Sequence, residues 1–328
     1  MTVRETRSAA WNSYWASGVL HSCAGSFAGN YDQGLSAFWR AAFAELHSEA
    51  RVLDIGCGNG PLELLMVEAL GPDQLPWVDA VDLAQPVPPF LATLPEKVRE
   101  RLRFHGGVAA EQLPFKAECF DLVISQYGIE YSELEHSLAE AKRVLNPAGG
   151  FALVLHHAQS LPVRRGREEL AHLDWLLSAR SLLDRAEALV PWLAQLSRPG
   201  GRERLQASAE AAADRESYNE SVRALAERAA VLPTPDLLHE AQSAVASALS
   251  EAAMRGLDPG LGALQALRSE LELARLRQRE LVDCALDAEA VAGMVKALVG
   301  PGSRAHELAE VRIQGELFGW TLRIRSTV

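Results

Sequence analysis

The chain has 328 residues, 48% of them hydrophobic and 23% charged, which is the balance of a globular protein with one large domain or two of ordinary size. The formal net charge of −11 argues against a general affinity for nucleic acid or for anionic membrane surfaces. No apolar run approaches the roughly 20 residues of a membrane-spanning helix, and residues 1–5 do not open a signal peptide, because no apolar core follows them.

Four cysteines, at positions 23, 57, 119 and 284, are spread widely along the chain and form no C-x-x-C pair. They therefore predict neither a metal site nor a redox motif. Reduced thiols in a cytoplasmic protein are the expectation that follows. Cys57 is interpreted as a small residue that its glycine-rich surroundings tolerate.

The first 48 residues form the most aromatic part of the chain and are interrupted by four glycines. Residues 35–47 carry apolar side chains at helical spacing, so we expect a helix there that packs on a sheet. The aromatic residues before it have two interpretations: they seal the flank of the sheet, or they cover a ligand pocket. These residues are Trp11, Tyr14, Trp15, Phe27 and Tyr31.

Residues 51–61 predict a buried strand, a glycine turn and the start of a helix. Val52, Leu53 and Ile55 form a short β-prone run, as in a strand buried in a parallel sheet. The glycines at 56, 58 and 60 let the backbone turn sharply and let a ligand approach it closely. Pro61 suits the first turn of the helix, where its missing N–H costs nothing. The spacing differs from the dinucleotide fingerprint G-x-G-x-x-G, because the third glycine comes one position early.

A second strand is predicted at 77–83, and it has an acidic residue, Asp82, close to its end. A doubly wound nucleotide site needs a carboxylate about 20 residues after the glycine turn, where it accepts hydrogen bonds from ribose hydroxyls. The alternation of the strand places Asp79 in its middle and Asp82 at its end. We therefore predict that Asp82 is the ribose ligand. The alternative is an acid that only ends the strand or caps a helix.

The rest of the sheet is predicted in two stretches of chain. Three strand signals follow Asp82, with a helix before the last of them, and two more strands close the chain after another helix. The strands are expected at 102–107, 119–128, 151–155, 306–314 and 318–325, and the helices at 133–145 and 287–299.

The run of Asp54, Gly56, Gly58 and Gly60 reads D-x-G-x-G-x-G and resembles the first motif of class I S-adenosylmethionine (SAM) dependent methyltransferases. Residues 120–123 resemble the F-D-x-V strand of that family, and residues 143–150 resemble its R-V-L-x-P-G-G turn. The resemblance covers residues 35–157 and extends to 287–328. It implies an α/β fold with a Rossmann-like, seven-stranded doubly wound sheet and a closing antiparallel hairpin.

The resemblance also implies the cofactor and the residues that bind it. SAM would be the methyl donor and S-adenosylhomocysteine (SAH) the product, with the glycine loop against the methionine part and Asp54 near its ammonium group. Where the family commonly has an aspartate that binds the adenine amino group, this chain has Val108 or Ala109, so that contact must come from the backbone or from Glu111. The expected cofactor-binding residues are Tyr31, Asp54, Gly56, Cys57, Gly58, Gly60, Asp82, Leu83, Ala109, Ala110, Ser125 and Gln126.

A methyltransferase of this kind performs an in-line displacement by an oxygen, nitrogen or carbon nucleophile, and it mainly aligns the reactants and excludes water. A general base is needed only where the nucleophile carries a proton of high pKa. Tyr127 and His156 are the expected catalytic residues, with His157 and Glu130 as further candidates for the base. A histidine at the end of a strand is more often structural, and that alternative stays open.

Residues 159–286 have no strand signal and are rich in Ala, Leu, Glu and Arg. About four antiparallel helices are expected there, with breaks at 232–235 and 256–260. The predicted organisation is therefore residues 1–158 as the aromatic segment and first part of the SAM domain, 159–286 as a helical insertion, and 287–328 as its last helix and hairpin. The insertion is interpreted as a substrate cap, with a homodimer surface or a widened core as alternatives. One apolar heptad comprises Leu264, Leu267, Leu271, Ala274, Leu281 and Ala285.

These observations predict a SAM-dependent methyltransferase that acts on a small-molecule acceptor, with no nucleic-acid or membrane partner. Two alternatives are a methyltransferase directed at proteins and a non-catalytic protein of this fold whose insertion binds a partner. Nothing in the sequence identifies the acceptor atom.

Overall fold

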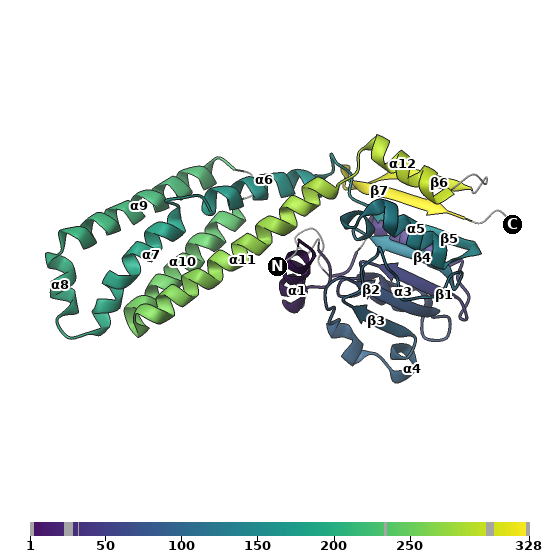
Figure 1. The fold of residues 1–328 in the computed structure, drawn as a ribbon, viewed down its shortest axis with the longest axis horizontal. Helices are drawn as coiled ribbons and strands as arrows, with labels where there is room; N and C mark the ends of the chain where they lie inside the picture. Colours follow the sequence, from purple (N-terminus) through teal and green to yellow (C-terminus); the bar gives the residue numbers. More distant parts are fainter. Residues whose placement is uncertain (1–2, 23–28, 32, 233–234, 300–304, 326–328) are drawn as a thin grey trace. The chain divides into compact units, whose positions relative to one another are not determined.

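The computed structural model describes residues 3–22, 29–31, 33–232, 235–299 and 305–325. The chain divides into two compact units, which we call the sheet unit (residues 1–166 and 280–328) and the helical unit (residues 167–279). The sheet lies in the first unit, which also holds both ends of the chain (Figure 1). Cys23, Phe27 and residues 233–234 of a predicted helix break lie outside the described residues.

Seven strands form one sheet in the order β3-β2-β1-β4-β5-β7-β6. Strands β1 to β5 pair in parallel, whereas β7 is antiparallel to β5 and β6 is antiparallel to β7. The prediction of a Rossmann-like sheet with a closing antiparallel hairpin is confirmed. The strands are β1 (Arg51–Ile55), β2 (Trp77–Asp82), β3 (Leu102–Gly106), β4 (Phe120–Gln126), β5 (Leu145–Leu155), β6 (His306–Ile313) and β7 (Glu316–Ile324).

Helices cover both faces of the sheet, because the central strands carry apolar side chains on both sides. In β1, Val52 packs with one core, and Leu53 and Ile55 pack with the other. The first core includes residues of α2 (Gln33–Phe43), α3 (Pro61–Leu70) and α4 (Glu96–Arg99). The second includes residues of α5 (Leu134–Val144) and α12 (Ala288–Val299). Short 3₁₀ helices η1 (Pro89–Thr93) and η2 (Ile129–Tyr131) lie in the connections.

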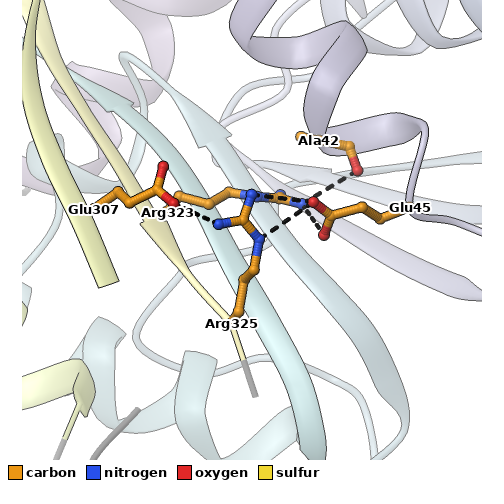
Figure 2. A network of polar contacts seen from close by, with 5 residues as sticks. All are labelled: Ala42, Glu45, Glu307, Arg323 and Arg325. Atoms are coloured by element: carbon orange, nitrogen blue, oxygen red, sulfur yellow. Dashed lines mark hydrogen bonds and ion pairs between the residues drawn. The ribbon is translucent and has the colours of Figure 1, made fainter. Parts of the chain in front are cut away.

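A cluster of charges ties the residues after α2 to the last strand (Figure 2). Glu45 accepts hydrogen bonds from the guanidinium groups of Arg323 (2.8 Å) and Arg325 (3.1 Å). Arg323 is buried and also donates to the carbonyl oxygen of Ala42, while Arg325 forms a second ion pair with Glu307. The segment before β1 is thus fixed on the strand that closes the sheet.

Helix α1 (Val3–Ala16) was not predicted from the sequence, because its apolar residues are mixed with many polar ones. Its aromatic residues Trp11, Tyr14 and Trp15 do stand at helical spacing, but the helix as a whole is only weakly amphipathic. It is part of the sheet unit.

The helical unit contains more helices than the four or so predicted. Helix α6 (Leu161–Leu176) enters it, and α11 (Leu257–Cys284) leaves it. Leu264 and Leu271 of the predicted heptad are buried in its apolar core. No described helix of the chain is long and apolar enough to cross a membrane. Between α6 and α11 lie α7 (Leu182–Leu193), η3 (Ala194–Ser197), α8 (Gly201–Ala207), α9 (Ala209–Ala230) and α10 (Asp236–Arg255).

Candidate active site

A cavity opens at the carboxyl ends of β1, β2 and β4, where the order of the sheet reverses between β1 and β4. This switch point is where ligands bind in open α/β sheets. The cavity walls come from the glycine loop, from the residues that follow β2, β3 and β4, and from helix α1. On the sheet side they include Gly56, Cys57, Gly58, Asp82, Leu83, Val108, Ala109, Ala110, Glu111, Gln126, Tyr127, Gly128, Tyr131 and Ser132.

The glycine loop has the backbone conformation that its sequence predicts. Gly56, Gly58 and Gly60 have φ values of +77°, +52° and +76°, which residues other than glycine rarely adopt. A Cβ atom at Gly56 would lie 2.7 Å from the Cα atom of Gly128, and one at Gly58 would lie 2.6 Å from the ring of Trp15. The glycines therefore let the backbone of Gly128 and the ring of Trp15 lie against the loop.

Asp82 is the last residue of β2, and its carboxylate is hydrogen-bonded to the glycine loop. Its Oδ2 atom accepts a hydrogen bond from the backbone N–H of Gly58, and its Oδ1 atom accepts one from Ala84, each at 2.8 Å. Asp79, by contrast, pairs with Arg51 (2.8 Å) and His105 (2.9 Å) and does not line this cavity. The predicted strand register is confirmed, while the ribose contact itself stays a prediction.

Gln126, at the end of β4, has its amide group held in one orientation. The indole N–H of Trp39 donates to Oε1 of Gln126, and an indole nitrogen can only donate. The Nε2 atom must therefore point elsewhere, and among the described residues it has no hydrogen-bond partner. Gln126 is 7% exposed and lines the cavity, so it offers a fixed N–H donor to a bound ligand.

Residues 52–149 match the family model described as a methyltransferase domain. The chain is 35% identical, over 159 residues, to the uncharacterized methyltransferase YcgJ of Bacillus subtilis, a match that covers 47% of this chain and 58% of that protein. It is 31% identical, over 159 residues, to the ubiquinone/menaquinone biosynthesis C-methyltransferase UbiE of Burkholderia mallei, covering 43% of this chain and 60% of that protein. This chain contains a class I SAM-dependent methyltransferase domain.

A similar solved structure is the 1,6-didemethyltoxoflavin-N1-methyltransferase of Burkholderia thailandensis with bound 1,6-didemethyltoxoflavin and SAH. It is 25% identical, with a TM-score of 0.34, and the match covers 48% of this chain and 66% of that one. The chain thus spans somewhat less than two thirds of the two curated relatives, and the matches leave about half of its own residues uncovered.

Most of the predicted cofactor-binding residues of the methyltransferase domain come together around the cavity. Those that line it are Tyr31, Gly56, Cys57, Gly58, Asp82, Leu83, Ala109, Ala110 and Gln126, and those that do not are Asp54, Gly60 and Ser125. The Ser125 hydroxyl instead joins β1 to η2, because it donates to the carbonyl oxygen of Ile55 (2.6 Å) and accepts from the N–H of Ile129 (2.9 Å).

Asp54 lies in the core beside another carboxyl group, that of Glu63 in α3. Both side chains are buried, at 1% and 0% exposure. Burial and the neighbouring Glu63 raise the pKa of Asp54 well above its usual value, and burial raises the pKa of Glu63 to about 7. The pair therefore retains a proton near neutral pH. The predicted contact between Asp54 and the ammonium group of SAM stays a prediction, because Asp54 is not part of the cavity lining.

Of the two expected catalytic residues, only Tyr127 lines the cavity. Its ring stacks on that of His156 with 4.1 Å between the ring centroids, and its hydroxyl donates to the carbonyl oxygen of Phe318 at 3.3 Å. His156 is 2% exposed, and burial lowers its pKa to about 3, so the ring is neutral across the physiological range. Glu130 is also buried and accepts a hydrogen bond from the backbone N–H of His156. Catalytic roles for Tyr127 and His156 stay predictions.

Helix α1 contributes three residues to the cavity, of which the sequence indicated Trp11 and Trp15 in one of two interpretations and did not indicate Arg7. Arg7, Trp11 and Trp15 line the cavity, and the rings of Trp11 and Trp15 stack with centroids 5.7 Å apart. Tyr131 packs edge-on against Trp11 at the same separation of 5.7 Å. The available signal was the high aromatic content of the first 48 residues. Of the two interpretations of these aromatic residues, that they seal the flank of the sheet or that they cover a ligand pocket, the positions of Trp11 and Trp15 agree with the second.

Proposed function

We propose that this chain is a SAM-dependent methyltransferase that moves a methyl group to a small-molecule acceptor. The observation that carries the proposal is the cavity at the β1/β4 switch point. It combines a glycine loop whose backbone a ligand can approach, a carboxylate at the end of β2, and the fixed amide donor of Gln126. This set of groups suits a cofactor that carries an amino-acid end and a ribose.

The residues around the cavity fit SAM by their chemistry. Asp82 would accept hydrogen bonds from the ribose hydroxyls with the lone pairs that the N–H groups of Gly58 and Ala84 leave available. Gln126 would donate to an oxygen of the methionine part. The Ala109 and Ala110 backbone, with Glu111, would border the adenine. Bound SAM supplies an electrophilic methyl group on a sulfonium centre.

The protein's own contribution is to align the acceptor and to keep water out. The indole ring faces of Trp11 and Trp15 can both stabilise a neighbouring positive charge and exclude water. His156 is neutral and lies behind Tyr127, so we propose that positioning, rather than proton removal by His156, accounts for most of the rate enhancement. Tyr127 has φ of +53°, a strained conformation that places its ring against the cavity.

The preference for a small-molecule acceptor is supported by one curated relative, whose name assigns it to ubiquinone/menaquinone biosynthesis. The negative charge of the chain also disfavours nucleic acid. For the helical unit we keep the proposal that it contributes to acceptor binding, with dimerisation as a second role. A protein-directed enzyme and a non-catalytic SAM-binding protein are the competing functions.

One experiment separates these functions. The protein is incubated with SAM carrying a radiolabelled methyl group and with either a protein-free small-molecule extract or a denatured protein extract. Label transferred to the small-molecule fraction, with SAH formed in equal amount, supports the proposal. Label in the protein fraction would favour the protein-directed enzyme, and SAH binding without transfer to either fraction would favour the non-catalytic protein.

A further inference from the structure

Glu280, near the end of α11, lies far along the chain from the methyltransferase motifs, yet it contacts the wall of the cofactor cavity. Its side chain is buried, at 7% exposure. The Oε1 atom accepts a hydrogen bond from Nε of Arg7, with which it forms an ion pair, and Oε2 accepts one from the indole N–H of Trp11 at 3.3 Å. One carboxylate therefore holds two residues that line the cavity.

Arg7 and Trp11 are four residues apart and face the same way from α1. The Nη1 atom of Arg7 also donates to the carbonyl oxygen of Tyr131 at 2.8 Å, so Arg7 joins Glu280 to the residues after β4. Trp11 in turn stacks on Trp15 and packs edge-on against Tyr131. Fixing these two side chains therefore fixes the aromatic wall of the cavity.

Three further hydrogen bonds join α1 to the residues after β2 and to the glycine loop. Ser8 donates to the carbonyl oxygen of Leu83 (3.3 Å), and Asn12 accepts from the N–H of Gln85 (2.6 Å), both just after β2. Asn59 of the glycine loop donates to the carbonyl oxygen of Trp15 (3.0 Å). The carboxylate of Glu280 supplies the negative charge opposite Arg7. Its loss would leave a guanidinium and an indole N–H partly buried without their acceptor.

We propose that Glu280 is a positioning residue of the cofactor site, which it serves by holding Arg7 and Trp11 against the cavity. The segment of chain that follows the helical unit is thereby part of the SAM site. The inference rests on the proposed function for the identity of the ligand, SAM or SAH. The hold of Glu280 on α1 does not depend on the ligand and is measured separately.

The test compares Glu280→Ala, Glu280→Gln and Trp11→Phe with the wild type. Asp283→Asn serves as the control, because Asp283 is an exposed acid one turn further along α11. Hydrogen exchange reports on the amides of residues 4–16 in the unliganded protein, and calorimetry measures the affinity for SAH. For Glu280→Ala we expect faster exchange over α1 and about tenfold weaker SAH binding, as from loss of a charge-assisted hydrogen bond.

Glu280→Gln keeps the shape and one acceptor oxygen, so its affinity for SAH should lie between those of the wild type and Glu280→Ala. Trp11→Phe removes the indole N–H and should weaken SAH binding even if Glu280→Ala fails to fold. Asp283→Asn should match the wild type. Unchanged exchange over α1 and unchanged SAH affinity in Glu280→Ala, or equal losses in Asp283→Asn, would overturn the inference. A wild type that does not bind SAH would instead refute the proposed function, and the exchange experiment would still decide whether Glu280 holds α1.

Discussion

The indole N–H of Trp39, in the helix before the first strand, hydrogen-bonds Oε1 of Gln126, at the end of the fourth strand of the sheet. Trp39 is fully buried and stacks on Phe43, so the donor cannot move away. The contact decides which end of the Gln126 amide has no hydrogen-bond partner among the described residues, namely Nε2. A residue in the core thereby sets the hydrogen-bonding character of the ligand site.

Gln126→Glu should weaken SAH binding by about tenfold, because it keeps an acceptor for Trp39 but removes the unpaired N–H donor that we propose for the cofactor. Trp39→Phe should give a smaller loss, since the freed amide can still rotate into the useful orientation. Calorimetry with SAH measures both effects, and Phe38→Leu controls for packing beside Trp39. If Gln126→Glu binds SAH as tightly as the wild type, the amide does not contact the cofactor.

Asp82→Ala should weaken SAH binding by roughly tenfold or more, because a carboxylate on the ribose hydroxyls contributes about 1.5–3 kcal/mol. Asp79→Ala is the matched control. It should lower the thermal stability, since Arg51 and His105 lose their partner, while the SAH affinity stays unchanged. The reverse pattern in the two titrations would show that the ribose is bound by the other acid.

Glu130→Gln should stabilise the protein more at pH 8 than at pH 5. Burial raises the pKa of Glu130 from its usual 4.5 to about 7, so the folded chain binds this proton more tightly than the unfolded chain does. The stability contributed by the protonated form is complete below pH 4.5 and is lost as the pH rises to about 7. The neutral amide avoids this loss, which is worth roughly 1–3 kcal/mol.

Urea unfolding at the two pH values measures the effect. Burial also raises the pKa of Glu63 to about 7, so the stability of the wild type depends on pH through Glu63 as well. The decisive quantity is therefore the difference in unfolding free energy between the wild type and Glu130→Gln at each pH. An equal difference at pH 5 and pH 8 would mean that Glu130 is not buried as a protonated acid.

Replacing the helical unit, residues 167–279, by a short linker should leave SAH binding intact and abolish methyl transfer if that unit contributes to acceptor binding. The deletion must stop before Glu280 and Leu286, because Leu286 donates its N–H to the carbonyl oxygen of His156 and accepts from the indole of Trp320. Transfer activity and mass by light scattering are the two measurements. A monomeric truncation that retains full turnover would show that the unit serves association only.

The sequence predicted the structure best where a short run of residues determines the local backbone conformation. The glycines of the loop, the strand that ends at Asp82 and the closing hairpin all follow from short patterns, and each is where it was predicted. Alternation along β2 was enough to separate Asp82 from Asp79. These features depend on neighbouring residues, so a single sequence contains the information that specifies them.

The contacts that could not be predicted join residues far apart in the chain. Glu280 lies 273 residues from Arg7, and Trp39 lies 87 residues from Gln126. Asp54 has the sequence position of a ligand-binding acid, yet its burial beside Glu63 depends on how α3 packs under the loop. No local pattern indicates such partners, because tertiary packing alone brings them together.

The central claim is that SAM binds against the glycine loop, and calorimetry of SAH with wild type and Gly58→Val side by side tests it most directly. At Gly58 the backbone has φ of +52°, and a Cβ atom would lie 2.6 Å from the ring of Trp15, so a valine there must displace the loop or the aromatic wall. We predict saturable binding of one SAH per chain to the wild type and no measurable binding to Gly58→Val, with circular dichroism showing that the variant is folded. Equal affinity in the two proteins, or no binding to the wild type, would contradict the account.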